Sequence, residues 1–257
     1  MAKVGVLVVR AAGINCDQET MHAWRLAGAE PKLVQVNELI RSPELLEGVQ
    51  VLTIPGGFSY GDDIAAGKIL ANRFAHHLTD SLRDFIASGK LVLGICNGFQ
   101  VLVRMGLLPG GVLTSGCLSL AFNSSARFED RWVRLRVETE RCVFLRRLEK
   151  QWEAPVAHAE GRLLVDSEAT LAGLRRAGHV ALTYVDADGR SGDYPVNPNG
   201  SVEGIAGLTD ETGQVLGLMP HPERHVDRTQ HPLWTRSSAE GPADGLGVFL
   251  SAVESLR

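Results

Sequence analysis

The chain has 257 residues, of which 44% are hydrophobic and 22% charged, the composition of an ordinary globular protein. Its 26 basic and 30 acidic residues give a net charge of −4 and are interspersed, so we expect no nucleic-acid binding, which needs clustered basic residues. No apolar run approaches the roughly 18 residues that cross a bilayer, and the N-terminus lacks a signal-peptide pattern. We therefore expect no membrane attachment, a cytoplasmic location and a single domain over residues 1–257.

The first half alternates short apolar runs with amphipathic stretches, which is typical of a parallel sheet whose strands are joined by helices. Between Ile64 and Ala87, leucines and phenylalanines recur every three or four residues, and Ser88-Gly89 follows. This pattern predicts one long helix. The buried strands that we expect here cover residues 4–9, 32–36, 49–54 and 90–95.

The second half is richer in strands, which implies a mixed sheet. The composition of residues 195–200 predicts a surface loop, and the segment Asp244 to Leu256 predicts a final helix. Extended segments are expected over residues 131–137, 155–157, 179–184, 205–209 and 215–219.

The most informative segment is an apolar strand that runs into Gly94-Ile95-Cys96-Asn97-Gly98 and then into a helical pattern. Glycines on both sides of a turning residue permit the tight backbone of a nucleophile elbow, which lifts a side chain out of the strand end. The next helix would point its positive N-terminus at Cys96 and favour a thiolate. The alternative is a buried structural cysteine, but the glycines and the strand-to-helix setting favour a nucleophile.

A cysteine that attacks an amide needs a base, and the base needs a third group to orient it. His221 follows the apolar run 215–219, so the end of that strand would place it at the same sheet edge as Cys96. Pro222 holds the chain extended or turned, which brings the carboxylate of Glu223 within reach of the imidazole. Taken alone, the sequence His221-Pro222-Glu223 is better interpreted as a histidine in a proline-rich turn beside an exposed glutamate. Together with the elbow, the motif predicts a Cys96–His221–Glu223 triad.

A buried strand also opens into Pro55-Gly56-Gly57. Because consecutive glycines let backbone N–H groups approach a ligand closely, we expect Gly57 and Asn97 to form an oxyanion hole and Gly56 to contact the substrate. A plain tight turn is the alternative, and without Cys96 it would be preferred. Phosphate binding is not expected, because neither common glycine-rich phosphate motif follows the first strand.

The four cysteines, Cys16, Cys96, Cys117 and Cys142, include no Cys-x-x-Cys pair. This spacing indicates neither a zinc site nor a disulfide framework. We therefore expect no metal site, and we expect the three cysteines other than Cys96 to be structural.

In this order, Pro55-Gly56-Gly57, the segment 94–100 and His221-Pro222-Glu223 resemble the class I (triad) glutamine amidotransferases. Within that class the chain is similar, over almost its whole length, to glutaminase subunits of phosphoribosylformylglycinamidine synthase, which act in purine biosynthesis. The resemblance implies a flavodoxin-like three-layer α/β sandwich with a mixed, mainly parallel central sheet. The segments that carry the closer similarity are residues 56–62, 123–128, 131–133, 157–162, 197–201 and 219–224.

The resemblance implies that Cys96 attacks the side-chain carbonyl of L-glutamine and that His221, oriented by Glu223, passes the proton to departing ammonia. His221 would then activate the water that hydrolyses the thioester, and Gln100 would hold the amino-acid end of the substrate. The ammonia would pass through a channel to a separate large synthetase subunit, with a small third subunit bridging the two. ATP and Mg would bind to that synthetase subunit. The resemblance implies no cofactor for this chain, which lacks a phosphate-binding loop of its own.

Two segments depart from the family pattern, the loop 10–17 and residues 62–68, and both bear on subunit contacts more than on the triad. His158 lies in Ala-His-Ala-Glu-Gly-Arg, which resembles a family segment outside the triad and near the partner interface. Two alternatives stay open. One is a glutaminase that serves a different acceptor synthase; the other is a non-catalytic thiol-sensing α/β protein, in which the chemistry of Cys96 would depend neither on His221 nor on glutamine.

Overall fold

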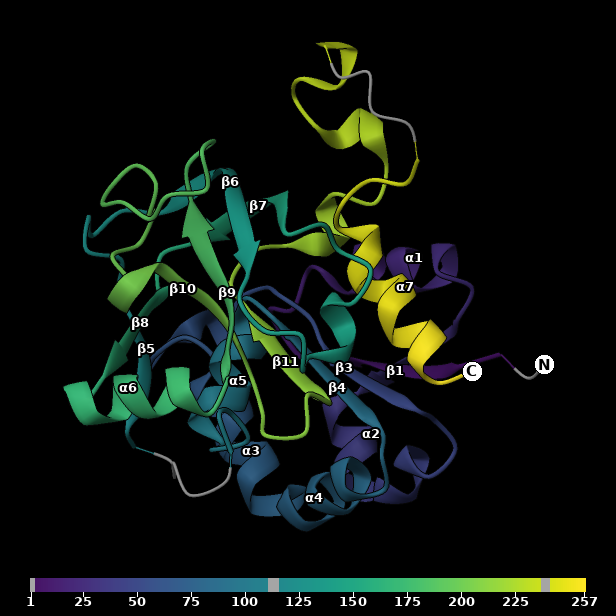
Figure 1. Ribbon diagram of the computed structural model, residues 1–257. Coiled ribbons are helices and arrows are strands. Elements are labelled where there is room, and N and C mark those ends of the chain that lie inside the picture. Colours follow the sequence, from purple (N-terminus) through teal and green to yellow (C-terminus); the bar gives the residue numbers. More distant parts are fainter. Residues whose placement is uncertain (1–2, 111–115, 237–240) are drawn as a thin grey trace.

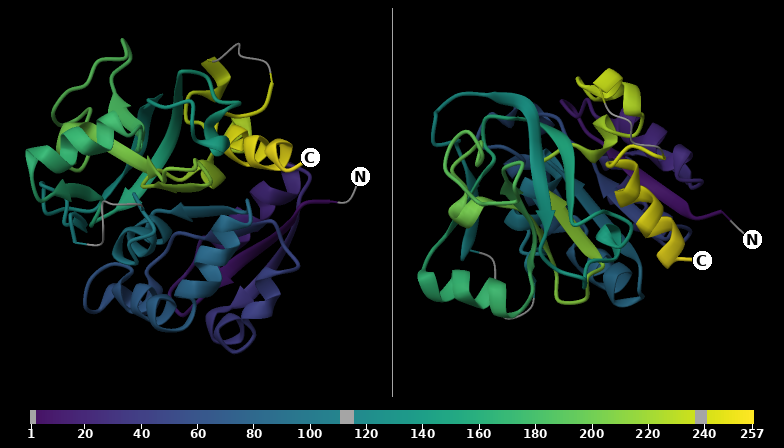
Figure 2. Two further views of the ribbon diagram at one scale, coloured as in Figure 1. Left: turned by 60° about the horizontal axis from the view of Figure 1, so that its bottom comes forward. Right: turned by 45° about the horizontal axis from the view of Figure 1, so that its top comes forward.

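The computed structural model describes residues 3–110, 116–236 and 241–257. A nine-stranded mixed sheet runs through the molecule in the order β2-β1-β3-β4-β11-β10-β9-β6-β7, and helices cover both of its faces (Figures 1 and 2). This arrangement confirms the predicted three-layer α/β fold. The strands are β1 (Gly5–Arg10), β2 (Glu30–Gln35), β3 (Val51–Ile54), β4 (Leu91–Ile95), β5 (Leu118–Ala121), β6 (Glu129–Val137), β7 (Gln151–His158), β8 (Arg162–Val165), β9 (Val180–Val185), β10 (Ile205–Thr209) and β11 (Val215–Leu218).

Helices α1 and α7 pack against each other on one face of the sheet, where Trp24 and Phe249 meet edge to face with ring centroids 5.0 Å apart. Helices α3, α4 and α5 lie on the other face (Figure 2). In the described parts of the chain no helix has the length and hydropathy needed to cross a bilayer. The helices are α1 (Asp17–Leu26), α2 (Val36–Arg41), α3 (Lys68–His77), α4 (Thr79–Ala87), α5 (Asn97–Arg104), α6 (Glu168–Arg176) and α7 (Leu246–Ser255).

Three neighbouring parallel strands bring the predicted motifs together. Strand β4 pairs in parallel with β3 on one side and with β11 on the other, in a register that aligns Ile54 with Gly94 and Leu218 with Ile95. Parallel strands end at the same edge of a sheet, so the turns after β3, β4 and β11 are neighbours. This confirms the expected placement of Gly57, Cys96 and His221.

The antiparallel half of the sheet supplies a wall opposite these turns. From β11 the sheet continues through β10, β9, β6 and β7 by antiparallel pairs. The end of β7 reaches the elbow, where the carbonyl oxygen of Ala157 lies 3.8 Å from Sγ of Cys96. The strand-rich second half therefore closes the site that the parallel half begins.

The prediction of one helix from Ile64 to Ala87 was wrong. Leu78 leaves the helical conformation (φ −128°, ψ 2°) and separates α3 from α4, while its side chain stays buried. At this point the hydroxyl of Thr79 donates to the carbonyl oxygen of Ala75 at 2.8 Å, a side-chain bond of the type that bends helices. Gly67 sets the start of α3, and Ile64 lies outside it, 71% exposed.

The prediction that residues 195–200 form a surface loop was wrong for its second half. Asn199 is fully buried, because its side chain donates to the carbonyl oxygen of Gly161 at 2.9 Å and accepts from the backbone N–H of Ser201 at 3.0 Å. Polar loop composition does not reveal such a long-range anchor. The short strands β5 and β8, which form a separate two-stranded sheet, were also not predicted.

Candidate active site

Cys96 occupies a strained elbow between β4 and α5. Its backbone has φ 51° and ψ −103°, a region that residues other than glycine rarely adopt. The two flanking glycines permit close packing: a Cβ on Gly98 would lie 1.9 Å from the carbonyl oxygen of Ile54, and one on Gly94 would lie 2.7 Å from that of Gly98. The side chain of Cys96 therefore sits at the N-terminus of α5, as the sequence predicted.

His221 and Glu223 form a buried pair beside the elbow. Nδ1 of His221 lies 2.6 Å from Oε1 of Glu223, and the two side chains are 2% and 0% exposed. Burial lowers the pKa of His221, but the charge of Glu223 and the contacts with Cys96 and Cys16 outweigh it and hold this pKa well above its usual value. The pair can thus keep a protonated imidazole beside Cys96.

Gly56 lies at the point where these side chains converge. A Cβ there would lie 2.7 Å from Cε1 of His221, 3.2 Å from Sγ of Cys16 and 3.4 Å from Cβ of Cys96. The missing side chain leaves room for the imidazole. Gly56 as a contact for the substrate remains a prediction.

Cys16, which we expected to be structural, also lies in the site. Its Sγ, a ring nitrogen of His221 and a carboxylate oxygen of Glu223 all lie within 4.8 Å of one another. Burial raises the pKa of the Cys16 thiol to about 11, so the thiol is neutral. The sequence did contain a signal that Cys16 lies in the site: it directly follows the turn after β1, and β1 ends at the same sheet edge as β3 and β4.

These three side chains are the group in the described residues whose spacing could hold a metal ion. A positive charge is already present at this position, because Nη2 of Arg224 donates to Sγ of Cys16 at 3.2 Å. The guanidinium therefore opposes the binding of a second cation there.

A cavity of about 160 Å³ opens beside Cys96. Cys96, Gly57 and Gln100 of the predicted residues line it. The amide of Gln100 is engaged within the protein, since Nε2 donates to the carbonyl oxygen of Glu160 at 2.6 Å and Oε1 accepts from Asn97 at 3.0 Å. The full lining comprises Gly57, Phe58, Asp62, Ala66, Cys96, Gln100, Ala157, His158, Ala159 and Glu160.

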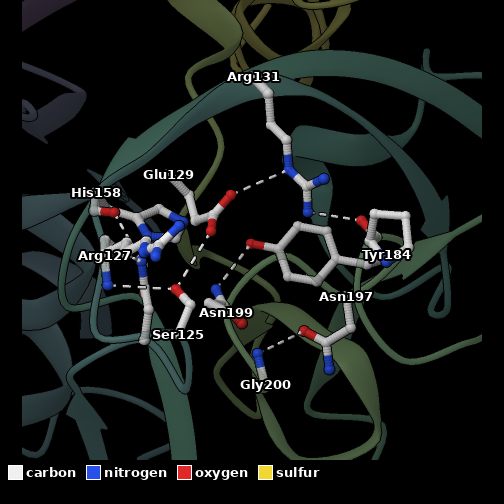
Figure 3. A network of polar contacts seen from close by, with 11 residues as sticks. Ser125, Arg127, Glu129, Arg131, His158, Tyr184, Asn197, Asn199 and Gly200 are labelled. Atoms are coloured by element: carbon white, nitrogen blue, oxygen red, sulfur yellow. Dashed lines mark hydrogen bonds and ion pairs between the residues drawn. The ribbon is translucent and has the colours of Figure 1, made fainter.

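The cavity wall at residues 157–161 is fixed from behind by a buried polar network. Asn123 accepts at Oδ1 from the N–H of Gly161 at 3.0 Å and contacts Nδ1 of His158 at 3.1 Å. Figure 3 shows the adjoining contacts, in which Asn199 donates to the hydroxyl of Tyr184 at 3.4 Å. Burial, followed by the charge of His221, lowers the pKa of His158 to about 3, so this imidazole is neutral.

Comparison with known proteins identifies the family. The model of the CobB/CobQ-like glutamine amidotransferase domain matches residues 3–255. The chain belongs to this family. It is 43% identical to "Phosphoribosylformylglycinamidine synthase subunit PurQ" of Dehalococcoides mccartyi, over 100% of this chain and 99% of that protein. The corresponding protein of Archaeoglobus fulgidus is 40% identical over 99% of this chain and 98% of its own length.

Among solved structures, this amidotransferase matches a chain of "Structure of PurLQS from Thermotoga maritima" with a TM-score of 0.75 and 35% identity, and the match covers both chains completely. A second match, to a structure described as a glutamine amidotransferase from Thermotoga maritima, has a TM-score of 0.51 at 14% identity and covers 99% of this chain and 92% of that one. At that identity the likeness supports the fold alone.

In this amidotransferase, the structure brings all the predicted site residues to one sheet edge. Cys96, His221, Glu223, Gly56, Gly57, Asn97 and Gln100 lie around the ends of β3, β4 and β11. Their individual catalytic roles remain predictions. Sequence reasoning missed Cys16, and it missed the polar support behind His158.

Proposed function

We propose that the chain is a glutaminase that hydrolyses L-glutamine and supplies the ammonia to the synthetase subunit of phosphoribosylformylglycinamidine synthase. The observation that carries this proposal is the convergence of Cys96 and the His221–Glu223 pair at the edge of one sheet, beside a cavity that Cys96 lines. A nucleophile, a base and a group that orients the base are the minimum for acyl transfer from an amide.

In the proposed reaction, the Cys96 thiolate attacks the side-chain carbonyl carbon of glutamine. The N–H groups of Asn97 and Gly57 stabilise the negative oxygen of the tetrahedral intermediate, since Asn97 begins α5 and its N–H has no intrahelical partner. Protonated His221 gives its proton to the nitrogen as the carbon–nitrogen bond breaks and ammonia leaves. His221 then takes a proton from water, which attacks the thioester and releases glutamate.

The cavity wall formed by residues 157–160 binds the amino-acid end of glutamine. The Gln100 side chain holds the carbonyl of Glu160, so we assign Gln100 the task of positioning the segment 157–160. This modifies the expectation that Gln100 helps to hold the amino-acid end of the substrate. Gly57 lines the cavity between this wall and the elbow.

The acceptor follows from the relatives. Proteins 40–43% identical over nearly the full chain are named subunits of phosphoribosylformylglycinamidine synthase, and a matching chain belongs to a PurLQS structure. By analogy, a large synthetase subunit with ATP and Mg forms formylglycinamidine ribonucleotide in the cytoplasm, and a small subunit bridges the two. The chain functions as one domain over residues 1–257.

The test is peptide-mapped mass spectrometry after exposure to an electrophilic glutamine analogue, with and without excess glutamine. We expect labelling at Cys96 that glutamine suppresses, and none at that peptide in Cys96→Ala. Cys142→Ala is the matched control, because this cysteine is also buried but does not line the cavity beside Cys96, and it should leave labelling unchanged.

Equal labelling of Cys96 with and without glutamine, in the presence of the synthetase, would overturn the proposal and favour the thiol-sensing interpretation. If glutamine suppresses the labelling of Cys96, but formylglycinamide ribonucleotide and the synthetase do not stimulate glutamine hydrolysis, the ammonia goes to a different acceptor.

A further inference from the structure

Arg224 follows Glu223 in the chain, yet the hydrogen bonds of its guanidinium go to other acceptors. Nε of Arg224 donates to Oε1 of Glu19 at 2.9 Å, and Nη2 donates to Sγ of Cys16 at 3.2 Å. Both acceptors belong to the first part of the chain, more than 200 residues away, at the start of α1. Helix α1 therefore determines where this positive charge sits.

Glu223 offers the guanidinium a competing partner. Its Oε2 is buried and has no hydrogen-bond partner among the described residues, while Oε1 is bound to His221. A buried carboxylate oxygen without a partner is costly, and an adjacent arginine is its natural donor. Other contacts must therefore keep the guanidinium of Arg224 from bonding to Oε2 of Glu223. The hydrogen bonds that the structure gives it are those to Glu19 and Cys16.

Cys16 is a firmly placed acceptor. Its N–H donates to the carbonyl oxygen of Gly56 at 3.4 Å, and its own carbonyl oxygen accepts from the N–H and the hydroxyl of Thr20 at 3.0 and 2.6 Å. The thiol hydrogen is directed to Oδ1 of Asn15 at 3.3 Å, which leaves the sulfur lone pairs for Arg224. The side chain is 1% exposed, so water does not compete for this contact.

We propose that Cys16 and Glu19 are positioning residues that hold the guanidinium of Arg224 away from Glu223, so that the carboxylate of Glu223 acts on His221 alone. This inference rests on the proposed role of His221 as the base. If the guanidinium paired with Oε2 of Glu223, its charge would offset that of the carboxylate and the imidazolium of His221 would lose stabilisation. Cys16 thus has a positioning role through Arg224, in addition to its own contact with His221.

The ionisable groups that face His221 come from separate elements: Cys96 from the elbow, Glu223 from its own turn, His158 from the end of β7, and Cys16 from the start of α1. The thiol of Cys16 is itself a hydrogen-bond partner that raises the pKa of His221, so Cys16→Ala also removes a direct contact. Glu19→Gln leaves all four groups in place, and the part of the Cys16 effect that Arg224 transmits is found by comparison with and without the guanidinium.

The test measures the pKa of His221 by NMR on protein labelled with ¹⁵N-histidine, with the signal assigned by His221→Asn. Cys16→Ala and Glu19→Gln should each lower this pKa by about one unit. Cys16→Ser, whose hydroxyl oxygen can also accept from Arg224, should stay close to the wild type. Arg25→Gln, which removes an exposed arginine from the same helix, is the control.

The decisive comparison uses Arg224→Gln as background. With the guanidinium gone, Cys16→Ala should shift the titration of His221 less than it does when Arg224 is present, because only the direct contact is then lost. Glu19→Gln, which acts through Arg224, should no longer shift it. A purely structural effect would be the same in both backgrounds. An unchanged titration in Cys16→Ala, or an equal shift with and without Arg224, would overturn the inference.

The NMR readout does not depend on turnover. Failure of the glutaminase proposal would instead show as labelling of Cys96 that glutamine does not suppress. In the active enzyme, the same shift should move the alkaline limb of the kcat/KM profile for glutamine to lower pH, because that limb follows loss of the imidazolium.

Discussion

Gly56 and His221 lie so close together that a methyl group on Gly56 would be 2.7 Å from Cε1 of the imidazole. The φ angle of Gly56 is outside the left-handed region, so the added methyl group would change packing and not backbone strain. The position of the proposed base is therefore set by the absence of one side chain on the neighbouring strand end.

Gly56→Ala should lower kcat for glutamine hydrolysis by roughly 10²-fold, because a displacement of about 1 Å at a catalytic group has an effect of that size. Gly48→Ala is the matched control, since nothing lies within 4 Å of a Cβ there and its φ is also ordinary. Steady-state glutamate release measures both variants. Equal kcat values would show that the imidazole tolerates the displacement.

Glu223→Gln should lower kcat/KM by about 10³- to 10⁴-fold, because an amide can present its NH₂ group to Nδ1 of His221 and favour the wrong tautomer. The pKa of His221 should fall as well, since the charge of Glu223 raises it. The measurement is the pH profile of kcat/KM. Glu203→Gln, at an exposed ion pair with Arg175, should leave the profile unchanged.

Asp62→Ala should raise KM for glutamine about tenfold, a loss typical of one hydrogen bond to a charged group. Oδ1 of Asp62 accepts from Nδ2 of Asn97 and from the N–H of Gly67, both at 3.1 Å, and Asn97 in turn orients Gln100. Asp63→Ala alters the adjacent exposed carboxylate and serves as control. A similar KM in both variants would contradict the proposed positioning.

The neutral state of His158 predicts an acid-sensitive fold. Its pKa of about 3 in the folded protein is below the unfolded value of about 6.5, so between these pH values the unfolded chain binds a proton that the folded chain does not. Stability should therefore fall by about 1.4 kcal/mol per pH unit as the pH drops through this window. The measurement is the free energy of unfolding by urea at several pH values. Its dependence on pH should be steeper in the wild type than in His158→Gln by this amount, whereas His76→Gln, at an exposed histidine, should keep the wild-type dependence.

The sequence by itself determined the features that depend on local pattern. Apolar runs of four to six residues predicted β1, β3, β4, β10 and β11, and the glycines around Cys96 predicted the elbow, because strand burial and turn geometry are encoded by neighbouring residues. A strand was also expected at residues 32–36, but the expectation that it is buried was wrong: β2 lies at the edge of the sheet and only Val34 of its six residues is buried. His221 and Glu223 were within reach of the same reasoning, since they are two residues apart and follow a recognisable strand.

Only the tertiary structure decided the features that join distant segments. The contacts of Arg224 with Cys16 and Glu19 span more than 200 residues, and the burial of Asn199 depends on Gly161. The break at Leu78 likewise escaped a helical pattern that looked continuous. Such contacts follow from the order in which the strands assemble, β1 beside β3, β3 beside β4 and β4 beside β11, and spacing along one chain does not contain that order.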